Sequence, residues 1–347
     1  MYLAQAYKTL HEWWRYVVGI LIIFIAIAVG QVPFTVAVIA KSVQNGESLI
    51  GLDESKLLSV LEPNLNLFLM LLSFAAGLVA VIFVAKFIHN QSFTLLTTAR
   101  KKIDWKRFWF AFILWGIVSS SFVLIGYFAA PEDYVLNFKL QPFLILCVIA
   151  IIFVPLQTSF EEYLFRGYLM QGIGVLVKNK WMPLLTTSVV FGMMHIANPE
   201  VEKLGYITLV YYIGTGLFLG IITLMDDGLE LALGFHAANN LFTALLVTAD
   251  WTAFQTAALF KDISAPSLMT ELVAMAGGVD CLGNCNQPSV SLANTALQQA
   301  QPDVLFVALC GFDLSRTEQD LPLLKSLPGW AELPCVREGR VYYTDGN

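Results

Sequence analysis

Charged side chains are scarce in this sequence. Asp, Glu, Lys and Arg make up 13% of its 347 residues, whereas soluble domains contain about 25%. Hydrophobic residues make up 57% of the chain, and the mean hydropathy is +0.68. The few basic residues form no stripe of the kind that binds phosphate backbones, so a nucleic-acid partner is excluded. This composition indicates an integral membrane protein.

Common signatures of hydrolytic enzymes are also missing. The zinc-binding pattern His-Glu-x-x-His does not occur. No Ser or Cys is placed as an evident nucleophile, because Cys147 stands alone inside an apolar segment and the other cysteines follow residue 264. Histidine is rare, and His11 and His89 lie beside apolar segments, where we interpret them as interfacial. Any chemistry must therefore come from other side chains.

Seven apolar segments follow one another before residue 250. A transmembrane helix needs about 20 apolar residues, and most of the segments reach that length, although two are irregular. We therefore predict an all-α polytopic membrane protein that crosses the bilayer about seven times. The segments are Tyr16–Ala40, Leu65–Ala85, Phe108–Ala130, Phe143–Leu156 continuing through Pro155 into Phe160–Val177, Met182–Ala197, Tyr206–Met225 and Leu229–Thr248.

Basic residues gather in alternate loops, at residues 8–15, 100–107 and 178–180. Cytoplasmic loops collect Lys and Arg, so these three sites predict a cytoplasmic N-terminus. With seven crossings, the residues after Asp250 then lie outside the cytoplasm. The turn at Asp226 and Asp227 falls on the cytoplasmic side although it is acidic; acidic residues have little weight in this rule.

Polar residues recur at a spacing of four inside the apolar region, which puts them on one face of a helix. Burying a charged side chain at the centre of a membrane helix costs roughly 2.5–3.5 kcal/mol on insertion scales. A set of polar and charged side chains in this setting therefore indicates a site where a chemical reaction takes place. The three patterns are Glu161-Glu162-x-x-x-Arg166, Phe191-x-x-x-His195 and His236-x-x-x-Asn240.

The two adjacent glutamates point about 100° apart on a helix, so only one can face a given point directly. Glu162 and Arg166 stand in the favourable acid-before-base order. We predict that one glutamate is the working base, while the other is held by Arg166 or orients a neighbour. The sequence does not decide which of Glu161 and Glu162 is the base. A salt bridge near a helix end is the alternative interpretation of this pattern.

His195 and His236 follow the glutamates closely in sequence. Each could simply bond to a neighbouring carbonyl, but together with the glutamates they can activate water. The amide of Asn240 can hold a substrate carbonyl or an oxyanion. Both histidines with Glu161 or Glu162 could also bind a metal ion, for which zinc is the candidate. A glutamate mechanism requires no metal. Hydrolysis of a peptide bond within the membrane is the leading chemistry, and a proton-coupled transporter is the alternative.

The order of these three patterns resembles the CPBP family of intramembrane proteases, the CAAX-protease and bacteriocin-processing group also called Abi. The resemblance covers residues 143–248. It implies an intramembrane endopeptidase in which a glutamate of the first motif activates water while the histidines and the asparagine assist or hold the oxyanion. The matching residues are Glu161, Glu162, Arg166, His195, His236 and Asn240.

The resemblance also sets expectations for partners and location. The substrate is expected to be a peptide or protein, with prenylated and bacteriocin-like chains as candidates, and the location is expected to be a bacterial inner membrane. Relatives with a role in bacteriocin immunity leave a second alternative open, namely a non-catalytic immunity or scaffold protein. Such a protein would tolerate the loss of Glu161 and Glu162.

The amino-acid composition changes near Ser264, where Asp, Gln, Asn, Pro and Cys become frequent. Residues 271–280, 302–313, 327–330 and 339–342 resemble the C-terminal lobe of a periplasmic cobalamin-type substrate-binding protein. A strand at Val304–Leu309, a helix at Leu321–Ser326 and a strand at Arg340–Tyr343 give a βα-type pattern. We expect two domains, residues 1–264 as the protease and residues 265–347 as a partial α/β segment.

Cobalamin binding by this tail is not expected, because cleft binding needs two lobes and less than half of such a protein matches. A fused remnant or an artefact of gene joining is the favoured interpretation. Cys281 and Cys285 could form a disulfide or part of a metal site, and could equally be unpaired.

Overall fold

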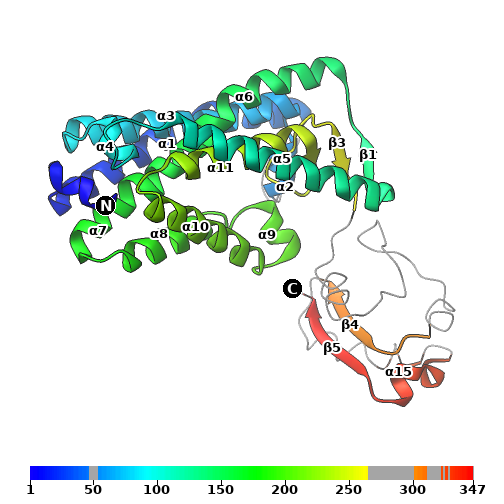
Figure 1. The fold of residues 1–347 in the computed structure, drawn as a ribbon. Helices are drawn as coiled ribbons and strands as arrows, with labels where there is room; N and C mark the ends of the chain where they lie inside the picture. Colours follow the sequence, from blue (N-terminus) through cyan, green and yellow to red (C-terminus); the bar gives the residue numbers. More distant parts are fainter. Residues whose placement is uncertain (47–53, 265–300, 311–321, 323–324, 327–328, 347) are drawn as a thin grey trace. The chain divides into compact units, whose positions relative to one another are not determined.

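The computed structural model describes residues 1–46, 54–264, 301–310, 322, 325–326 and 329–346. Contacts between residues divide the chain into two compact units, Met1–Ile263 and Ser264–Asn347. Figure 1 shows the helices of the first unit side by side.

Helices dominate the first unit, and within its described residues five are long and apolar enough to cross a membrane. This confirms an all-α polytopic membrane protein. Two of the five continue from an α-helix into a π-helix. The five are α1 (Trp13–Asn45), α3 (Pro63–Phe83) with η2 (Val84–Ile88), α5 (Trp105–Ala129), α6 (Leu140–Glu162) with η4 (Tyr163–Leu169) and α7 (Met170–Val177), and α10 (Thr208–Met225).

The two remaining apolar segments form shorter helices. The predicted segment Met182–Ala197 gives α8 (Trp181–Met193), which is 13 residues long, and Leu229–Thr248 gives α11 (Glu230–Leu246), which is 17 residues long. Helix α8 ends at Met193, so His195 lies in the turn that follows rather than inside the helix. Helix α11 packs against α5 and α6, and α8 packs against α10.

Local sequence explains several helix boundaries. Helix α3 begins with Pro63 in its first turn, where a missing N–H costs nothing, and the side chain of Glu62 accepts hydrogen bonds from the backbone of residues 64 and 65. The side chain of Asp104 caps α5 in the same way. Pro155 lies inside α6, and the chain stays helical past it, as the sequence predicted. Helix α6 therefore delivers both glutamates at its C-terminal end.

Short elements complete the first unit. Strands β1 (Tyr134–Leu136), β3 (Phe260–Asp262) and β2 (Val247–Thr248) form a small sheet in that order, antiparallel between β1 and β3 and parallel between β2 and β3. The short helices are η1 (Leu3–Lys8), α2 (Glu54–Ser59), α4 (Phe93–Thr97), η3 (Pro131–Asp133) and α9 (Pro199–Leu204).

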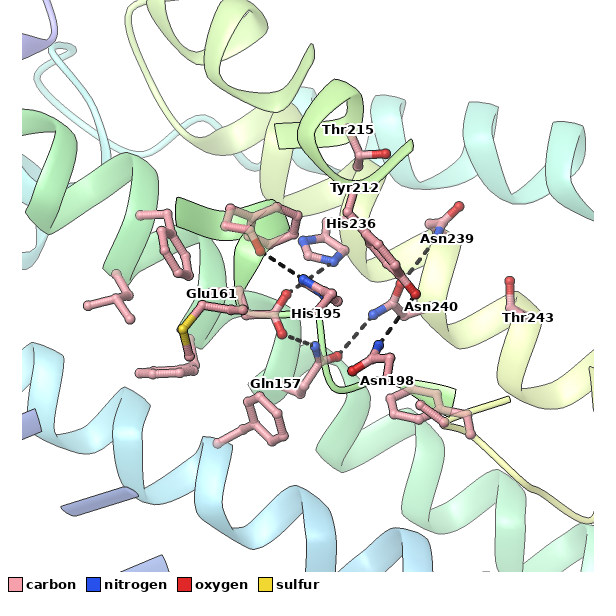
Figure 2. Close-up of a pocket in the computed structure, with 18 of the residues that line it drawn as sticks. Gln157, Glu161, His195, Asn198, Tyr212, Thr215, His236, Asn239, Asn240 and Thr243 are labelled. Carbon is pink, nitrogen blue, oxygen red and sulfur yellow. Dashed lines mark hydrogen bonds and ion pairs between the residues drawn. The ribbon is translucent and has the colours of Figure 1, made fainter. Parts of the chain in front are cut away.

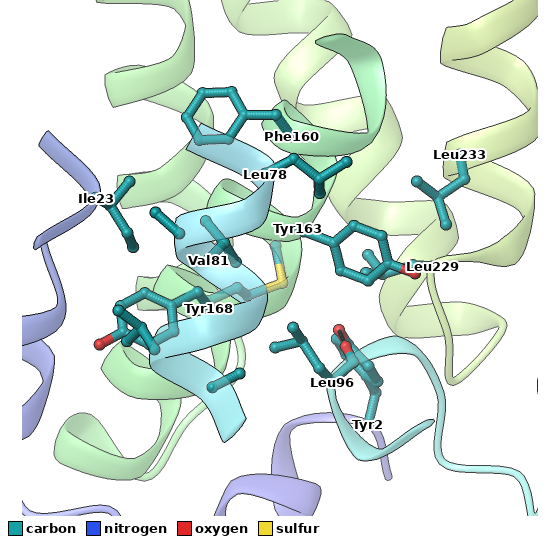
Figure 3. Close-up of a cluster of buried hydrophobic side chains, with 14 of the residues drawn as sticks. Tyr2, Ile23, Leu78, Val81, Leu96, Phe160, Tyr163, Tyr168, Leu229 and Leu233 are labelled. Atoms are coloured by element: carbon teal, nitrogen blue, oxygen red, sulfur yellow. Dashed lines mark hydrogen bonds between the residues drawn. The ribbon is translucent and has the colours of Figure 1, made fainter. Parts of the chain in front are cut away.

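A buried apolar cluster fixes the helix that carries the glutamates (Figure 3). Phe160 and Tyr163 come from this helix, and they pack with Leu78 and Val81 of α3 and with Leu233 of α11. Many other large apolar side chains face outward along α1 and α5. An outward apolar surface of this kind suits contact with lipid chains.

An ion-pair network joins the basic loop at residues 100–107 to the turn between α10 and α11. Arg100 contacts Asp226 at 3.0 Å and Glu230 at 3.3 Å, and Arg107 also pairs with Asp226. The acidic turn and the basic loop thus lie at the same end of the bundle. This pairing accounts for acidic residues on the side where the sequence places the positive charge.

The second unit has a two-stranded parallel pairing of β4 (Leu305–Cys310) with β5 (Val341–Gly346). A short helix, α15 (Pro334–Arg337), precedes β5, and Trp330, Leu333 and Cys335 form a small apolar cluster. The two strands overlap those predicted from the sequence. Half of the predicted helix Leu321–Ser326, together with Cys281 and Cys285, lies outside the described residues. The resemblance to a binding-protein lobe stays a prediction.

Candidate active site

The two glutamates lie where α6 passes into the π-helix η4. Glu161 is 8% exposed, and Glu162 and Arg166 are completely buried. A π-helical segment is rare and often occurs at a functional site. Because buried carboxylates are costly unless they are paired and hydrogen-bonded, the partners of each glutamate indicate what it does.

Glu162 is held by two cationic or hydrogen-donating groups. Its Oε1 accepts hydrogen bonds from Arg166 Nη1 at 3.0 Å and from His236 Nδ1 at 2.7 Å. The other terminal nitrogen of Arg166 donates to the carbonyl of Gly216 at 3.2 Å, and the guanidinium lies 4.3 Å from the ring centre of Phe191. This arrangement holds Glu162 against its own helix and α11.

Glu161 has different neighbours. Its Oε1 accepts a hydrogen bond from Gln157 Nε2 at 2.6 Å, and its Oε2 lies 3.5 Å from Nε2 of His236. The imidazole of His236 therefore spans the two carboxylates. Since Glu162 accepts the proton on Nδ1, the other ring nitrogen of His236 faces Glu161.

A cavity of about 910 Å³ lies beside Glu161 and His236 (Figure 2). Four of the six predicted residues line it, namely Glu161, His195, His236 and Asn240. Glu162 and Arg166 are not among the described residues that line it, and they lie behind Glu161 and His236. Most of the other lining residues are aromatic or aliphatic. The cavity is therefore an apolar space with a polar group at one part of its wall.

A hydrogen bond to the backbone and a stack against another ring position the side chain of His195. Its Nδ1 donates to the carbonyl of Phe191 at 2.8 Å. Its ring stacks on Tyr212 at 4.1 Å between centres, with 18° between the planes, and Asn198 donates to the Tyr212 hydroxyl at 3.3 Å. The backbone carbonyl can only accept, so neutral His195 has its free lone pair on Nε2.

Several polar lining residues were not predicted from the sequence. Gln157 precedes Glu161 by one helical turn, so the same spacing of four could have found it. Asn239 adjoins the third motif. Tyr212 and Asn198 carry no such signal, because neither stands four residues from a motif residue.

The sequence left a metal site open as an alternative, but no group of suitable ligands occurs in the part of the chain that the structure describes. Nowhere in that part do three or more His, Cys, Asp or Glu side chains group in a way that could hold a metal ion. The imidazole of His195 stacks on Tyr212, whereas that of His236 spans the glutamates. Within the described residues, His195, His236, Glu161 and Glu162 therefore form no such group.

Glu200 at the start of α9 lies next to this site. Its Oε1 accepts the backbone N–H of Ala253 at 2.9 Å, and Ala253 itself lines the cavity. Burial raises the pKa of the Glu200 carboxyl above its ordinary value of 4.5, although the hydrogen bond from Ala253 opposes this rise. The folded state then binds the proton more tightly than the unfolded state. Its stability therefore falls as the pH rises from 4.5 through the folded-state pKa.

We expect Glu200→Gln to remove that loss. At pH 8 the variant should melt about 1–3 °C above the natural protein, and near pH 4 the two should melt together. Thermal melts in detergent across this pH range measure the difference. Glu202→Gln, on the exposed side of the same helix, is the matched control and should leave the melt unchanged. Equal melts of Glu200→Gln and the natural protein at pH 8 would contradict the expectation.

Comparison with known proteins agrees with the three motifs. A family model described as "Type II CAAX prenyl endopeptidase Rce1-like" matches residues 140–242, which contain all six predicted residues. An uncharacterized protein of Bacillus subtilis (strain 168), YyaK, is 30% identical over 236 residues, which cover 68% of this chain and 78% of that protein. No solved structure matches. The fold and the motifs define a multi-pass membrane protein of the CAAX endopeptidase class. The chain belongs to the Rce1-like family.

Proposed function

We propose that this protein cleaves a peptide bond inside the membrane, with a water molecule that Glu161 activates. The observation that carries the proposal is the different setting of the two glutamates. The carboxylate of Glu161 faces a large cavity, whereas Glu162 is paired with Arg166 behind it. A general base must reach the proton that it takes, and of the two only Glu161 meets this requirement in the described cavity.

The proposed reaction begins with a water molecule between Glu161 and a substrate carbonyl in the cavity. Glu161 takes a proton from the water as the water oxygen bonds to the carbonyl carbon. Collapse of the tetrahedral intermediate breaks the C–N bond, and the proton passes from Glu161 to the leaving nitrogen. His236, held at its Nδ1 by Glu162, places Nε2 3.5 Å from Glu161 Oε2, where it contacts this water.

The oxyanion needs a donor from the cavity wall. Asn240 lines the cavity, and its amide has two N–H bonds, one of which it donates to Gln157 at 3.1 Å. The second N–H is free to bond to the oxyanion. His195 would donate from Nε2 once it is protonated, because Nδ1 is already engaged with Phe191.

The cavity wall indicates the substrate class. Aromatic and aliphatic side chains make up most of it, so it suits an apolar stretch of peptide or a lipid group attached to one. Prenylated peptides and bacteriocin-like peptides are the proposed candidates. We place the reaction in a bacterial inner membrane, with α1, α3, α5, α6 to α8, α10 and α11 in the bilayer.

A peptide-library assay tests the function. The purified protein in detergent is incubated with apolar, prenylated and unmodified peptides, with and without a chelator, and products are identified by mass spectrometry. We expect cleavage that persists with the chelator. Loss of cleavage with the chelator and its return with zinc would contradict the proposed mechanism. Substrate flux in proteoliposomes without any cleavage would favour the transporter alternative.

A further inference from the structure

Four hydrogen bonds join side chains of α5, α11 and α6 into one continuous chain along the cavity wall. Trp115 Nε1 donates to Asn239 Oδ1 at 3.0 Å, and Asn239 Nδ2 donates to Asn240 Oδ1 at 3.0 Å. Asn240 Nδ2 donates to Gln157 Oε1 at 3.1 Å, and Gln157 Nε2 donates to Glu161 Oε1 at 2.6 Å. All five residues line the cavity, and Figure 2 shows the part from Asn239 to Glu161.

The direction of these bonds is determined by the two ends of the chain. An amide side chain alone can be turned either way, because its oxygen and nitrogen are similar in shape. An indole N–H can only donate, so Trp115 requires the oxygen of Asn239. An ionised carboxylate can only accept, so Glu161 requires the nitrogen of Gln157. Between these ends each amide has one orientation that satisfies both of its neighbours.

We propose that Gln157, Asn239 and Trp115 are positioning residues that keep Asn240 and Glu161 in a single working arrangement. This inference rests on the proposed function of Glu161 and Asn240. The hydrogen-bonded chain is called the amide relay below. It acts through Glu161 and Asn240, so its members need not touch the substrate.

The relay has a specific consequence at Asn240. In the observed direction its oxygen accepts from Asn239 and one N–H is donated to Gln157, so the second N–H remains for the oxyanion. If the amide turned over, its oxygen would face Gln157 and the nitrogen would face Asn239. Gln157 would then turn as well, and its oxygen would face the carboxylate of Glu161, where two acceptors repel each other.

Gln157→Met removes the centre of the relay while it keeps the length of the side chain. We expect kcat to fall about 10²-fold, as when one oxyanion donor is lost. KM should stay within about threefold, because the change affects groups that act in the transition state. A fall confined to KM would contradict a positioning role.

Two variants at Asn239 separate hydrogen-bond direction from packing. Asn239→Asp keeps the size of the side chain and accepts from Trp115, but at pH 8 it cannot donate to Asn240, so it drives the relay to reverse. Asn239→Ala only interrupts it. We therefore expect a kcat about tenfold lower for Asn239→Asp than for Asn239→Ala. If packing alone mattered, the isosteric Asp would be the milder change, and that order would overturn the proposal.

Coupling between the sites provides a readout that needs no substrate. The melting temperature is measured for Asn239→Asp alone and in a Gln157→Met background. Because Gln157→Met has already cut the relay, Asn239→Asp should lower the melt by less than half as much there. Trp115→Phe keeps the ring against Phe235, 4.2 Å away, and removes only the N–H. In that background the cost of Asn239→Asp should shrink in the same way.

The outcomes separate the relay from the function it serves. Additive shifts in melting temperature in both backgrounds overturn the relay, whether or not any peptide is cleaved. Coupled shifts in a protein that cleaves no peptide support the relay as a structural device and overturn the proposed function. Coupled shifts with the expected order of kcat support both.

Discussion

Glu161→Gln is expected to abolish peptide cleavage, with kcat at least about 10³-fold lower, because the amide cannot take a proton from water. The variant should still fold. Its carbonyl oxygen can accept the hydrogen bond that Gln157 donates to Glu161, and the side chain has almost the same volume. Turnover of a cleaved peptide, measured together with a thermal melt in detergent, checks both parts of the expectation.

Glu162→Gln is the matched control for this experiment. It removes the same charge one residue further along, but from a carboxylate that bonds to Arg166 and His236. We expect this variant to melt lower than Glu161→Gln, because it leaves the buried guanidinium without its counter-charge. Turnover by Glu161→Gln at the natural rate, with Glu162→Gln inactive and normally stable, would exchange the proposed roles.

The sequence predicted the elements of this site better than their orientation. All seven apolar segments are helical, and the motif residues lie close together, because the spacing of four and the burial cost depend only on local sequence. The choice between Glu161 and Glu162 did not follow, since it depends on what packs against each face of α6. In the fold, Gly234 lets α11 approach α5 closely, because any larger side chain there would collide with the backbone of Phe108. That approach helps to place His236 between the two glutamates.

The surroundings of His195 show the same limit. The sequence placed His195 inside a helix that continues to residue 197, whereas α8 ends at Met193. Hydropathy continues beyond this point, so it could not mark the end of the helix. The contact of His195 with Tyr212 joins the turn after α8 to α10. A contact between two different elements leaves no periodic signal in either one.

Arg166→Met should cost the protein most of its stability. Arg166 is completely buried and contacts Glu162 at 3.0 Å, and its removal leaves that carboxylate buried with His236 as its remaining partner among the groups described here. Breaking a buried ion pair by removing one partner costs about 3–5 kcal/mol. The variant also loses the contact with the ring of Phe191 and the hydrogen bond to Gly216. We therefore expect a low yield of folded protein and a melting temperature lowered by about 8 °C or more.

The double variant Arg166→Met with Glu162→Gln tests the cause of this loss. The neutral amide removes the unpaired charge, and its oxygen can still accept the Nδ1–H of His236. If the buried charge is what destabilises Arg166→Met, the double variant should recover about half of the lost stability or more, since a neutral pair is often tolerated where a broken ion pair is not. Chemical unfolding in detergent measures the recovery. A double variant as unstable as the sum of its two single changes would show that Arg166 stabilises the fold by packing rather than by neutralising Glu162.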